Sequence, residues 1–149
     1  MGTFVCLMLL VTCCTLAEGA CPVGFHHHGE SCYWFSRVKG NFAEAGSICR
    51  FLGSHLVVIT SAPEDAFIRG YATQTGKAFA YYIGGSDLGL EGRYVWDGDQ
   101  LLTYTNWSPG NPSNYFNVEH CLQIWQVNGY QWNDVDCKLV NNFICERPY

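Results

Sequence analysis

Apolar side chains recur at three- and four-residue spacing near residue 45. The repeating positions are Phe42, Ala45, Cys49 and Leu52. This spacing places them on one face of an α-helix. Asn41 is suited to cap the start of that helix and Gly53 to end it, so the pattern predicts a helix over residues 42–52.

A second helix is predicted from Ser61 onward. The sequence Ser61-Ala62-Pro63-Glu64 has the form of a capping box with a proline in the first turn. Phe67, Ile68 and Tyr71 follow at helical spacing and form the apolar face of this helix.

Beyond the second helix, the pattern changes to short apolar runs separated by Gly, Asn, Asp and Pro. These runs predict strands at residues 81–84, 93–96, 121–125 and 142–146. Helices followed by strands and long loops indicate the α+β class. The loop between Trp96 and Cys121 is longer than most loops in compact domains, which favours a functional role for it.

The N-terminus carries an apolar, uncharged run over positions 4–16, followed by small residues at Ala17, Gly19 and Ala20. The run is too short to span a membrane. Its position and length are typical of a secretory signal peptide. We therefore expect residues 1–19 to be a signal peptide and residues 20–149 to form one secreted, extracellular domain. The alternative is a buried N-terminal helix.

Removing the signal changes the cysteine count. The chain has nine cysteines, and Cys6, Cys13 and Cys14 lie in the expected signal. The other six are Cys21, Cys32, Cys49, Cys121, Cys137 and Cys145. An even number in a secreted domain predicts disulfides, although the spacing alone does not select one pairing.

Composition narrows the function classes. Aromatic residues make up 15% of the chain and charged residues only 14%, against about 25% charged in typical domains. One domain with a substantial core is therefore expected. The net charge is −5, or −4 once Glu18 leaves with the signal. Without a basic cluster, this charge argues against a nucleic-acid partner, and no second apolar stretch is long enough to span a membrane.

Oxygen-bearing side chains gather between residues 106 and 134. The candidates for binding a metal are Asn111, Ser113, Glu119, Asn133 and Asp134. Carboxylate, amide and hydroxyl oxygens are the ligands that calcium prefers. The segment therefore predicts a Ca²⁺ site that also offers donors and acceptors to a polar ligand.

From Cys21 to Glu146 the chain resembles the C-type lectin domain. The matching positions are Cys21-Pro22, Gly24-Phe25, Cys32-Tyr33, Ala45, Cys49, Gly53, Leu56-Val57, Ile59, Ser61, Glu64, Phe67-Ile68, Tyr82-Ile83-Gly84-Gly85, Trp96, Asn106-Trp107, Cys121, Trp132-Asn133-Asp134, Cys137 and Phe143-Ile144-Cys145-Glu146. The resemblance implies two helices, small antiparallel sheets and a long calcium-binding loop. It also implies the disulfides Cys49–Cys145 and Cys121–Cys137, with Cys21–Cys32 closing an N-terminal hairpin.

The resemblance also assigns roles in the long loop. Sugar-binding members hold calcium with a Glu-Pro-Asn or Gln-Pro-Asp motif, a Glu six residues later and a Trp-Asn-Asp strand. The motif position here is Asn111-Pro112-Ser113, with the proline expected to be cis, and Glu119 and Trp132-Asn133-Asp134 match the rest. Asn111, Ser113, Glu119 and Asn133 would then also contact the sugar.

This motif departs from the family pattern in one respect. The usual motifs add a carboxylate, whereas here only Glu119 and Asp134 supply one. We therefore expect weak calcium binding, at roughly 10⁻⁴–10⁻³ M. The alternative is a Trp-Asn-Asp strand retained for structural reasons beside an inactive site.

An auxiliary calcium site of mannose-binding members is only half matched. Asp87 and Glu91 match its first two ligand positions, but Asn114 and His120 stand where acids are usual. A solvated surface loop is the favoured interpretation of Asp87 and Glu91.

Two features favour a galactose-type sugar over a mannose-type sugar. Asn111 is an amide, closer to the Gln of the galactose motif, and Tyr115 stands where galactose binders often place a stacking aromatic. Packing of Tyr115 or Phe116 within the loop is the alternative.

Three further motifs are interpreted as structural. His26-His27-His28 is expected to be a polar turn of the N-terminal hairpin rather than a metal-binding tract. The sequon Asn106-Trp107-Ser108 is expected to be unmodified, because Trp107 matches a core position. No nucleophile elbow or HExxH helix occurs, so the chain is not expected to be an enzyme.

The sequence therefore predicts a secreted, calcium-dependent, carbohydrate-binding C-type lectin. The alternative is a protein of the same fold without sugar binding, such as a perlucin-like mineral-matrix protein or a protein-binding module.

Overall fold

The structure is a computed structural model that describes residues 19–149. The expected signal peptide therefore lies outside the described residues except for Gly19, and it stays a prediction. Among the described residues, no helix is both long and apolar enough to cross a membrane.

The first helix, α1, spans Phe42–Phe51, as its apolar spacing predicts. Asn41 caps it: its side chain accepts from the backbone N–H of Glu44, whose carboxylate accepts from the N–H of Asn41. Gly53 follows the helix with φ +66°, a conformation in which glycine avoids the strain of a side chain.

The second helix, α2, spans Ala62–Tyr71, and its apolar face packs into the core through the fully buried Ile68. The predicted capping box is only half formed. Ser61 accepts from the N–H of Glu64, but the Glu64 carboxylate accepts from Thr60 N and from the Tyr33 hydroxyl instead. This tertiary partner draws the side chain away from the helix cap. A π-helical turn, Ala72–Gly76, extends the helix.

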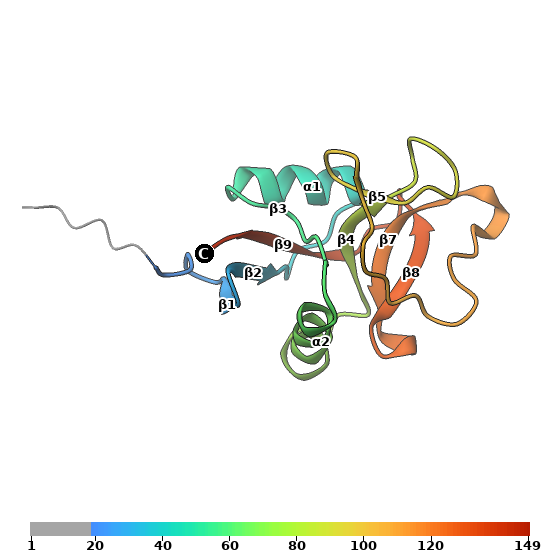
Figure 1. The fold of residues 1–149 in the computed structure, drawn as a ribbon. Helices are drawn as coiled ribbons and strands as arrows, with labels where there is room; N and C mark the ends of the chain where they lie inside the picture. The colour runs from blue at the N-terminus through green and yellow to red at the C-terminus, as the bar shows by residue number, and fades with distance from the viewer. Residues whose placement is uncertain (1–18) are drawn as a thin grey trace, which may run out of the picture.

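The strands form one continuous sheet, mostly antiparallel (Figure 1). They are β1 (His26–His28), β2 (Ser31–Phe35), β3 (His55–Leu56), β4 (Ala80–Ser86), β5 (Val95–Trp96), β6 (Gln100–Leu101), β7 (Glu119–Trp125), β8 (Gln131–Asp136) and β9 (Asn142–Pro148). The main path runs β1-β2-β9-β4-β5-β6, with β3 paired to β9, β7 to β4, and β8 to β7. β9 is parallel to β4 and antiparallel to β2, so it joins the two parts of the sheet. The predicted α+β class is confirmed.

The core lies between the helices and the sheet, and part of it is covered by Leu102, Tyr104 and Trp107 of the long loop. Its largest fully buried side chains include Trp132, Tyr81, Tyr82 and Phe143. The three predicted disulfides are present: Cys21–Cys32, Cys49–Cys145 and Cys121–Cys137. Cys49–Cys145 joins α1 to β9, and each native bridge in a small secreted domain contributes about 2–5 kcal/mol.

The prediction that His26-His27-His28 form a turn is wrong. They form strand β1, paired with β2, and the turn follows at Gly29 and Glu30. Aromatic neighbours explain the difference, because His28 stacks on Phe67 of α2 with ring centroids 4.1 Å apart.

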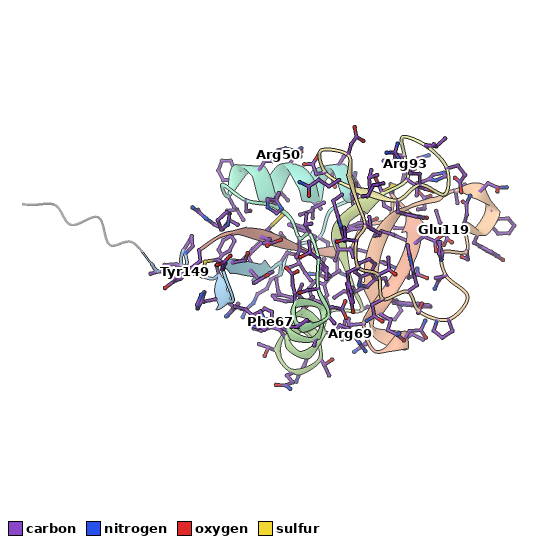
Figure 2. All side chains as sticks on the ribbon, viewed as in Figure 1. Arg50, Phe67, Arg69, Arg93, Glu119 and Tyr149 are labelled. Carbon is purple, nitrogen blue, oxygen red and sulfur yellow. A yellow bond between two sulfur atoms is a disulfide. The ribbon has the colours of Figure 1, made fainter. Side chains whose placement is uncertain are left out.

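The two ends of the described chain lie together. Tyr149 donates its backbone N–H to the carbonyl of Glu30 and its hydroxyl to the carbonyl of Gly19. Figure 2 places Tyr149 and Glu119 at opposite sides of the molecule, so the ends lie far from the loop that carries the candidate site.

Candidate functional site

Residues 106–108 of the long loop are hydrogen-bonded to strand β8. The backbone N–H of Trp132 donates to the carbonyl of Asn106, and the backbone N–H of Ser108 donates to the carbonyl of Trp132. Both hydrogen bonds are 2.9 Å long. The Ser108 hydroxyl also donates to the Trp132 carbonyl and accepts from the amide nitrogen of Asn111 at 2.6 Å. Because the nitrogen of the Asn111 amide is held in this way, its oxygen is left for another partner.

A buried acid holds the same segment from the other side. Asp65, in the first turn of α2, accepts from the Trp132 indole N–H at 2.8 Å and from the Asn106 amide at 2.7 Å. Sequence reasoning missed Asp65, because an acid in the first turn of a helix is also typical of a solvent-facing residue. The Asn106 nitrogen that a glycan would need is engaged, which favours an unmodified sequon.

The Asn111–Pro112 peptide bond is cis, as expected. After it, two backbone N–H groups converge on one buried carboxylate. Ser113 donates to Oδ1 of Asp134 at 2.9 Å, and Asn114 donates to Oδ2 at 2.6 Å. Asp134 lies on β8, so these bonds bring the loop and the strand together.

Glu119, the first residue of β7, provides the second carboxylate. It accepts from the Ser113 hydroxyl and from the Tyr115 N–H, each at 2.8 Å. A carboxylate has about four lone-pair positions, so both acids keep acceptor capacity for a cation. The structure therefore links Ser113, Glu119 and Asp134 directly.

The remaining candidate ligand, Asn133, adjoins this cluster. Its amide nitrogen donates to the backbone carbonyl of Asp134 at 2.5 Å, which leaves the amide oxygen free. Two carboxylates, two amide oxygens and a hydroxyl form a set of hard oxygen donors, and this set fits calcium.

Tyr94 supports the two acids, although no motif in the sequence indicates this role. Its hydroxyl donates to Asp134 Oδ2 at 3.5 Å and to the Glu119 carbonyl at 3.4 Å. Burial, and next the nearby Asp134 carboxylate, raise the pKa of Tyr94. The phenol therefore stays protonated and remains a hydrogen-bond donor to the site.

Two exposed aromatic rings follow the cis-proline turn. Tyr115 is 63% exposed and Phe116 is 78% exposed, and their ring centroids lie 4.2 Å apart. Neither ring belongs to the core, so both offer apolar surface beside the carboxylates.

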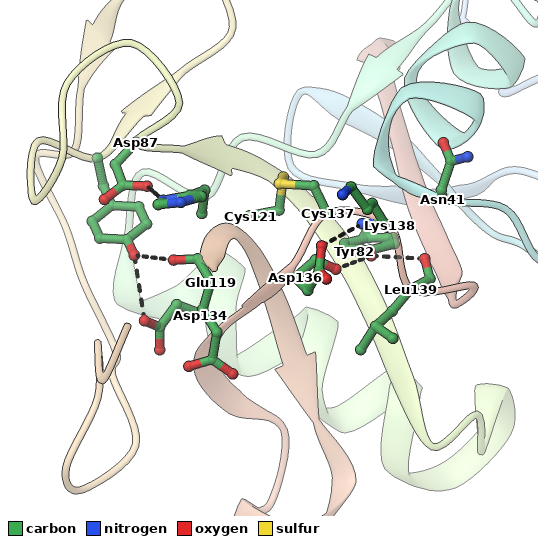
Figure 3. Close-up of a disulfide and its surroundings, with 12 residues drawn as sticks. Asn41, Tyr82, Asp87, Glu119, Cys121, Asp134, Asp136, Cys137, Lys138 and Leu139 are labelled. Atoms are coloured by element: carbon green, nitrogen blue, oxygen red, sulfur yellow. Dashed lines mark hydrogen bonds and ion pairs between the residues drawn. A yellow bond between two sulfur atoms is a disulfide. The ribbon is translucent and has the colours of Figure 1, made fainter. Parts of the chain in front are cut away.

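A second group of polar side chains lies close by. Asp87, just after β4, contacts His120 of β7 at 3.1 Å, and Glu91 contacts the same imidazole at 3.3 Å. The interpretation of both acids as a solvated loop is wrong for Asp87, which is only 2% exposed. Bonds to His120 and to the N–H of Gly92 replace water around it. Figure 3 shows Asp87, Glu119 and Asp134 on one side of the Cys121–Cys137 disulfide.

Comparison with known proteins assigns the fold and the long loop to a known family. The lectin C-type domain family matches residues 38–147. The chain belongs to the C-type lectin domain family. This is a family of non-enzymatic, carbohydrate-binding modules that also includes members without sugar binding, and its domains generally bind calcium.

Individual C-type lectin relatives cover most of the chain. Perlucin from Haliotis laevigata is 52% identical over 87% of this chain and 86% of its own. The galactose-specific lectin nattectin from Thalassophryne nattereri is 31% identical over 88% of this chain and 82% of its own. The carbohydrate-recognition domain of a mouse scavenger receptor C-type lectin superposes with a TM-score of 0.79, at 34% identity, over 86% of this chain and 96% of that domain.

Proposed function

We propose that this protein is a secreted lectin that binds carbohydrate through calcium. The proposed calcium ligands are Asn111, Ser113, Glu119, Asn133 and Asp134. One observation carries the proposal: Ser113, at the cis-proline turn, is hydrogen-bonded both to Glu119 of β7 and to Asp134 of β8. The paired strands β7 and β8 thus bring two carboxylates to one point of the loop.

In this proposal, bound calcium would accept two neighbouring hydroxyl oxygens of a sugar. The protein side chains orient the same sugar. Glu119 accepts from a sugar hydroxyl in a charge-assisted bond, while the amides of Asn111 and Asn133 can donate or accept. The buried position of Asp134 and its backbone donors keep the metal-binding oxygens in place.

We expect the calcium affinity to be modest, with a Kd of roughly 10⁻⁴–10⁻³ M, since only two carboxylates are present. Extracellular calcium suits such a site, in agreement with the proposed signal peptide over residues 1–19 and a mature lectin domain over residues 20–149.

A galactose-type ligand is the preferred sugar class in this proposal. Tyr115 is exposed beside the site and can stack on the apolar C–H face of a sugar. A relative named as a galactose-specific lectin supports the same choice. In competition elution from a glycan resin, galactose should elute at lower concentration than mannose, and Tyr115→Ala should reduce the difference. If mannose elutes the protein at lower concentration than galactose, and Tyr115→Ala does not change these concentrations, the galactose preference is wrong.

The calcium site is tested by comparing Glu119→Gln with Asp99→Asn. Both remove one carboxylate charge, but Asp99 is exposed in the β5–β6 hairpin, and its φ of +60° suits asparagine. Calorimetric calcium titration and a glycan array with calcium or chelator provide the readouts. Glu119→Gln should lower calcium affinity about tenfold or more and abolish glycan binding, while Asp99→Asn should behave as wild type.

Two results would overturn the proposal. Glycan binding that survives chelator would remove calcium from the mechanism. Absence of any glycan ligand in a folded, calcium-loaded protein would favour the alternative function, a lectin-fold mineral-matrix or protein-binding module.

A further inference from the structure

A second group of metal-ligating side chains lies beside the proposed calcium site. Asp87, Glu91 and His120 each place one ligand atom within 4.8 Å of the other two. We propose that these residues bind a divalent transition metal ion of the zinc class, independently of the calcium site.

The backbone fixes two of the three ligands as neighbours. Asp87 follows β4 and His120 lies in β7, two strands that pair through Ser86 and Cys121. The N–H of Asp87 donates to the carbonyl of His120 at 3.1 Å. The Cys121–Cys137 disulfide begins at the next residue after His120 and anchors this end of the strand.

A tight turn brings in the third ligand. Leu90 donates its backbone N–H to the carbonyl of Asp87 at 3.1 Å, which folds the chain back and places Glu91 over the imidazole. Gly92 then donates to Oδ2 of Asp87 at 2.8 Å. This bond occupies Oδ2 and leaves Oδ1 of Asp87 directed at His120. Gly92 thus orients Asp87 in the way that hydrogen-bond partners outside a metal site orient the metal ligands.

The distances match those between ligands of a small divalent ion. Zinc binds nitrogen and oxygen at about 2.0–2.2 Å, so two ligands at a tetrahedral angle lie about 3.3 Å apart. Nδ1 of His120 lies 3.1 Å from Asp87 Oδ1 and 3.3 Å from Glu91 Oε2. A small movement of the Glu91 side chain would bring all three ligand atoms to the distances of a zinc site.

The imidazole determines the class of ion. Calcium and magnesium take oxygen ligands, whereas imidazole suits zinc, copper, iron and nickel. Two carboxylates balance the charge of one divalent ion. Asp87 has a fully buried side chain, while those of His120 and Glu91 are 28% and 57% exposed. The group is therefore closed on the protein side and open to an entering ion and to water on the other.

Asn114 connects this group to the proposed calcium site. Its side-chain amide donates to Oε1 of Glu91 at 2.6 Å, and its backbone N–H donates to Asp134 at 2.6 Å. The same amide holds Glu91 by the oxygen that does not face His120, so Oε2 is left for the metal.

The histidine-rich segment His26–His28 does not form a comparable group of metal ligands. In β1, His26 contacts the Tyr71 hydroxyl at 2.6 Å, His27 contacts the Gly29 carbonyl at 2.8 Å, and His28 stacks on Phe67. Each ring thus has its own partner, and neighbouring residues of a strand point to opposite faces. His27→Asn is therefore a suitable control for zinc binding elsewhere.

The test is calorimetric titration of Zn²⁺ into the disulfide-bonded protein with calcium held at about 10 mM, which fills a site of the expected affinity. Visible absorption of Co²⁺ provides a second, spectroscopic readout of nitrogen and oxygen ligands. We expect one zinc ion per chain. His120→Asn and Glu91→Gln should each weaken zinc binding about tenfold or more, and His27→Asn should leave it unchanged.

Other outcomes overturn the inference. If the wild type binds no zinc or cobalt, or if Glu91→Gln and His120→Asn bind as wild type does, the three side chains form only an ion pair. If His27→Asn abolishes binding, the ion belongs to β1. Glu91 is exposed, so its variant remains informative even if His120→Asn fails to fold. The experiment measures zinc binding while calcium is saturating. A protein that binds no zinc would therefore refute this inference without bearing on the proposed lectin function.

Discussion

The half of the molecule built from α1, α2, β2, β4 and β9 differs sharply from the loop of residues 97–118. The first half is held by apolar packing, with Ile68, Ile83 and Ile144 fully buried. Within the loop, Ser108 is the only buried residue, and it is polar. Leu102, Tyr104 and Trp107 of the loop are partly buried against the core. The rest of the loop takes its shape from hydrogen bonds to acids and carbonyls of α2, β7 and β8.

This difference separates stability from binding. Apolar burial stabilises the fold and does not distinguish one loop shape from another, whereas directional bonds fix the loop but add modestly to the free energy of unfolding. Substitutions in the packed half should therefore change stability first, and substitutions in the loop should change ligand binding first.

Ile144→Ala should give the largest loss of stability. The side chain is fully buried in β9, so its truncation leaves a cavity and should cost about 2–5 kcal/mol in urea unfolding. Calcium affinity of the folded protein should stay within about twofold of wild type. The exposed Val140→Ala serves as control, and a parallel loss of calcium affinity in Ile144→Ala would refute the separation.

Asp65→Asn should affect both regions, because Asp65 joins α2 to the loop. An asparagine amide would place its NH₂ group against the donors Trp132 Nε1 or Asn106 Nδ2. We expect a loss of about 1–3 kcal/mol, together with weaker calcium binding. The control is the exposed Asp97→Asn. Stability loss with unchanged calcium affinity would mean that this anchor does not position the loop.

Ser108→Ala should weaken ligand binding by the loop with little change in stability. It removes the hydroxyl that holds the Asn111 amide, at a cost of about 1 kcal/mol. Calcium affinity should fall several-fold because Asn111 loses its orientation. Ser47→Ala, which removes an exposed hydroxyl bond on α1, is the matched control. If both serine variants bind calcium equally well, Asn111 is not a ligand.

Glu146→Gln should reveal the smallest effect, a change in pH dependence within the packed half. Burial raises the pKa of Glu146 above 4.5, although bonds from Val58 N and the Ser31 hydroxyl oppose the shift. Its stabilising contribution is thus complete below the unfolded pKa and is lost as pH rises through the folded pKa.

The stability of wild type relative to Glu146→Gln should therefore increase as pH is lowered from 7 towards about 4.5, by at most about 1.4 kcal/mol per pH unit. Urea unfolding of both proteins across this range gives the difference. Parallel stability profiles would show that Glu146 titrates alike in the folded and unfolded chains.

The sequence predicted elements whose signals are local. Both helices were predicted from apolar spacing and caps, and four strands were predicted within a few residues of their observed ends. The partner of Glu64 could not be predicted, because Tyr33 is far away in the sequence. The β1 strand was missed because its histidines are polar by composition, and their aromatic contacts arise only in the folded chain.

The candidate site divides in the same way. Its five expected ligands followed from residue type and family resemblance. The groups that position them, Asp65, Tyr94 and Ser108, carry no such pattern. The partners of Asp65 and Tyr94 are distant in the sequence, and Ser108 joins the nearby Asn111 to the distant Trp132. In the sequence Asn114 only departs from an acidic ligand position, whereas in the structure it joins two clusters of carboxylates.

The contact between the first and last described residues has a consequence for avidity. Gly19 and Tyr149 meet on the side opposite the long loop. A scaffold, bead or second copy held beside Gly19 or Tyr149 would therefore leave the loop facing outward. Several copies displayed together could engage a multivalent surface at once, and linkage of this kind can raise apparent affinity about 10²–10⁴-fold without any new contact. A single site of the proposed weak affinity would then suffice for firm attachment.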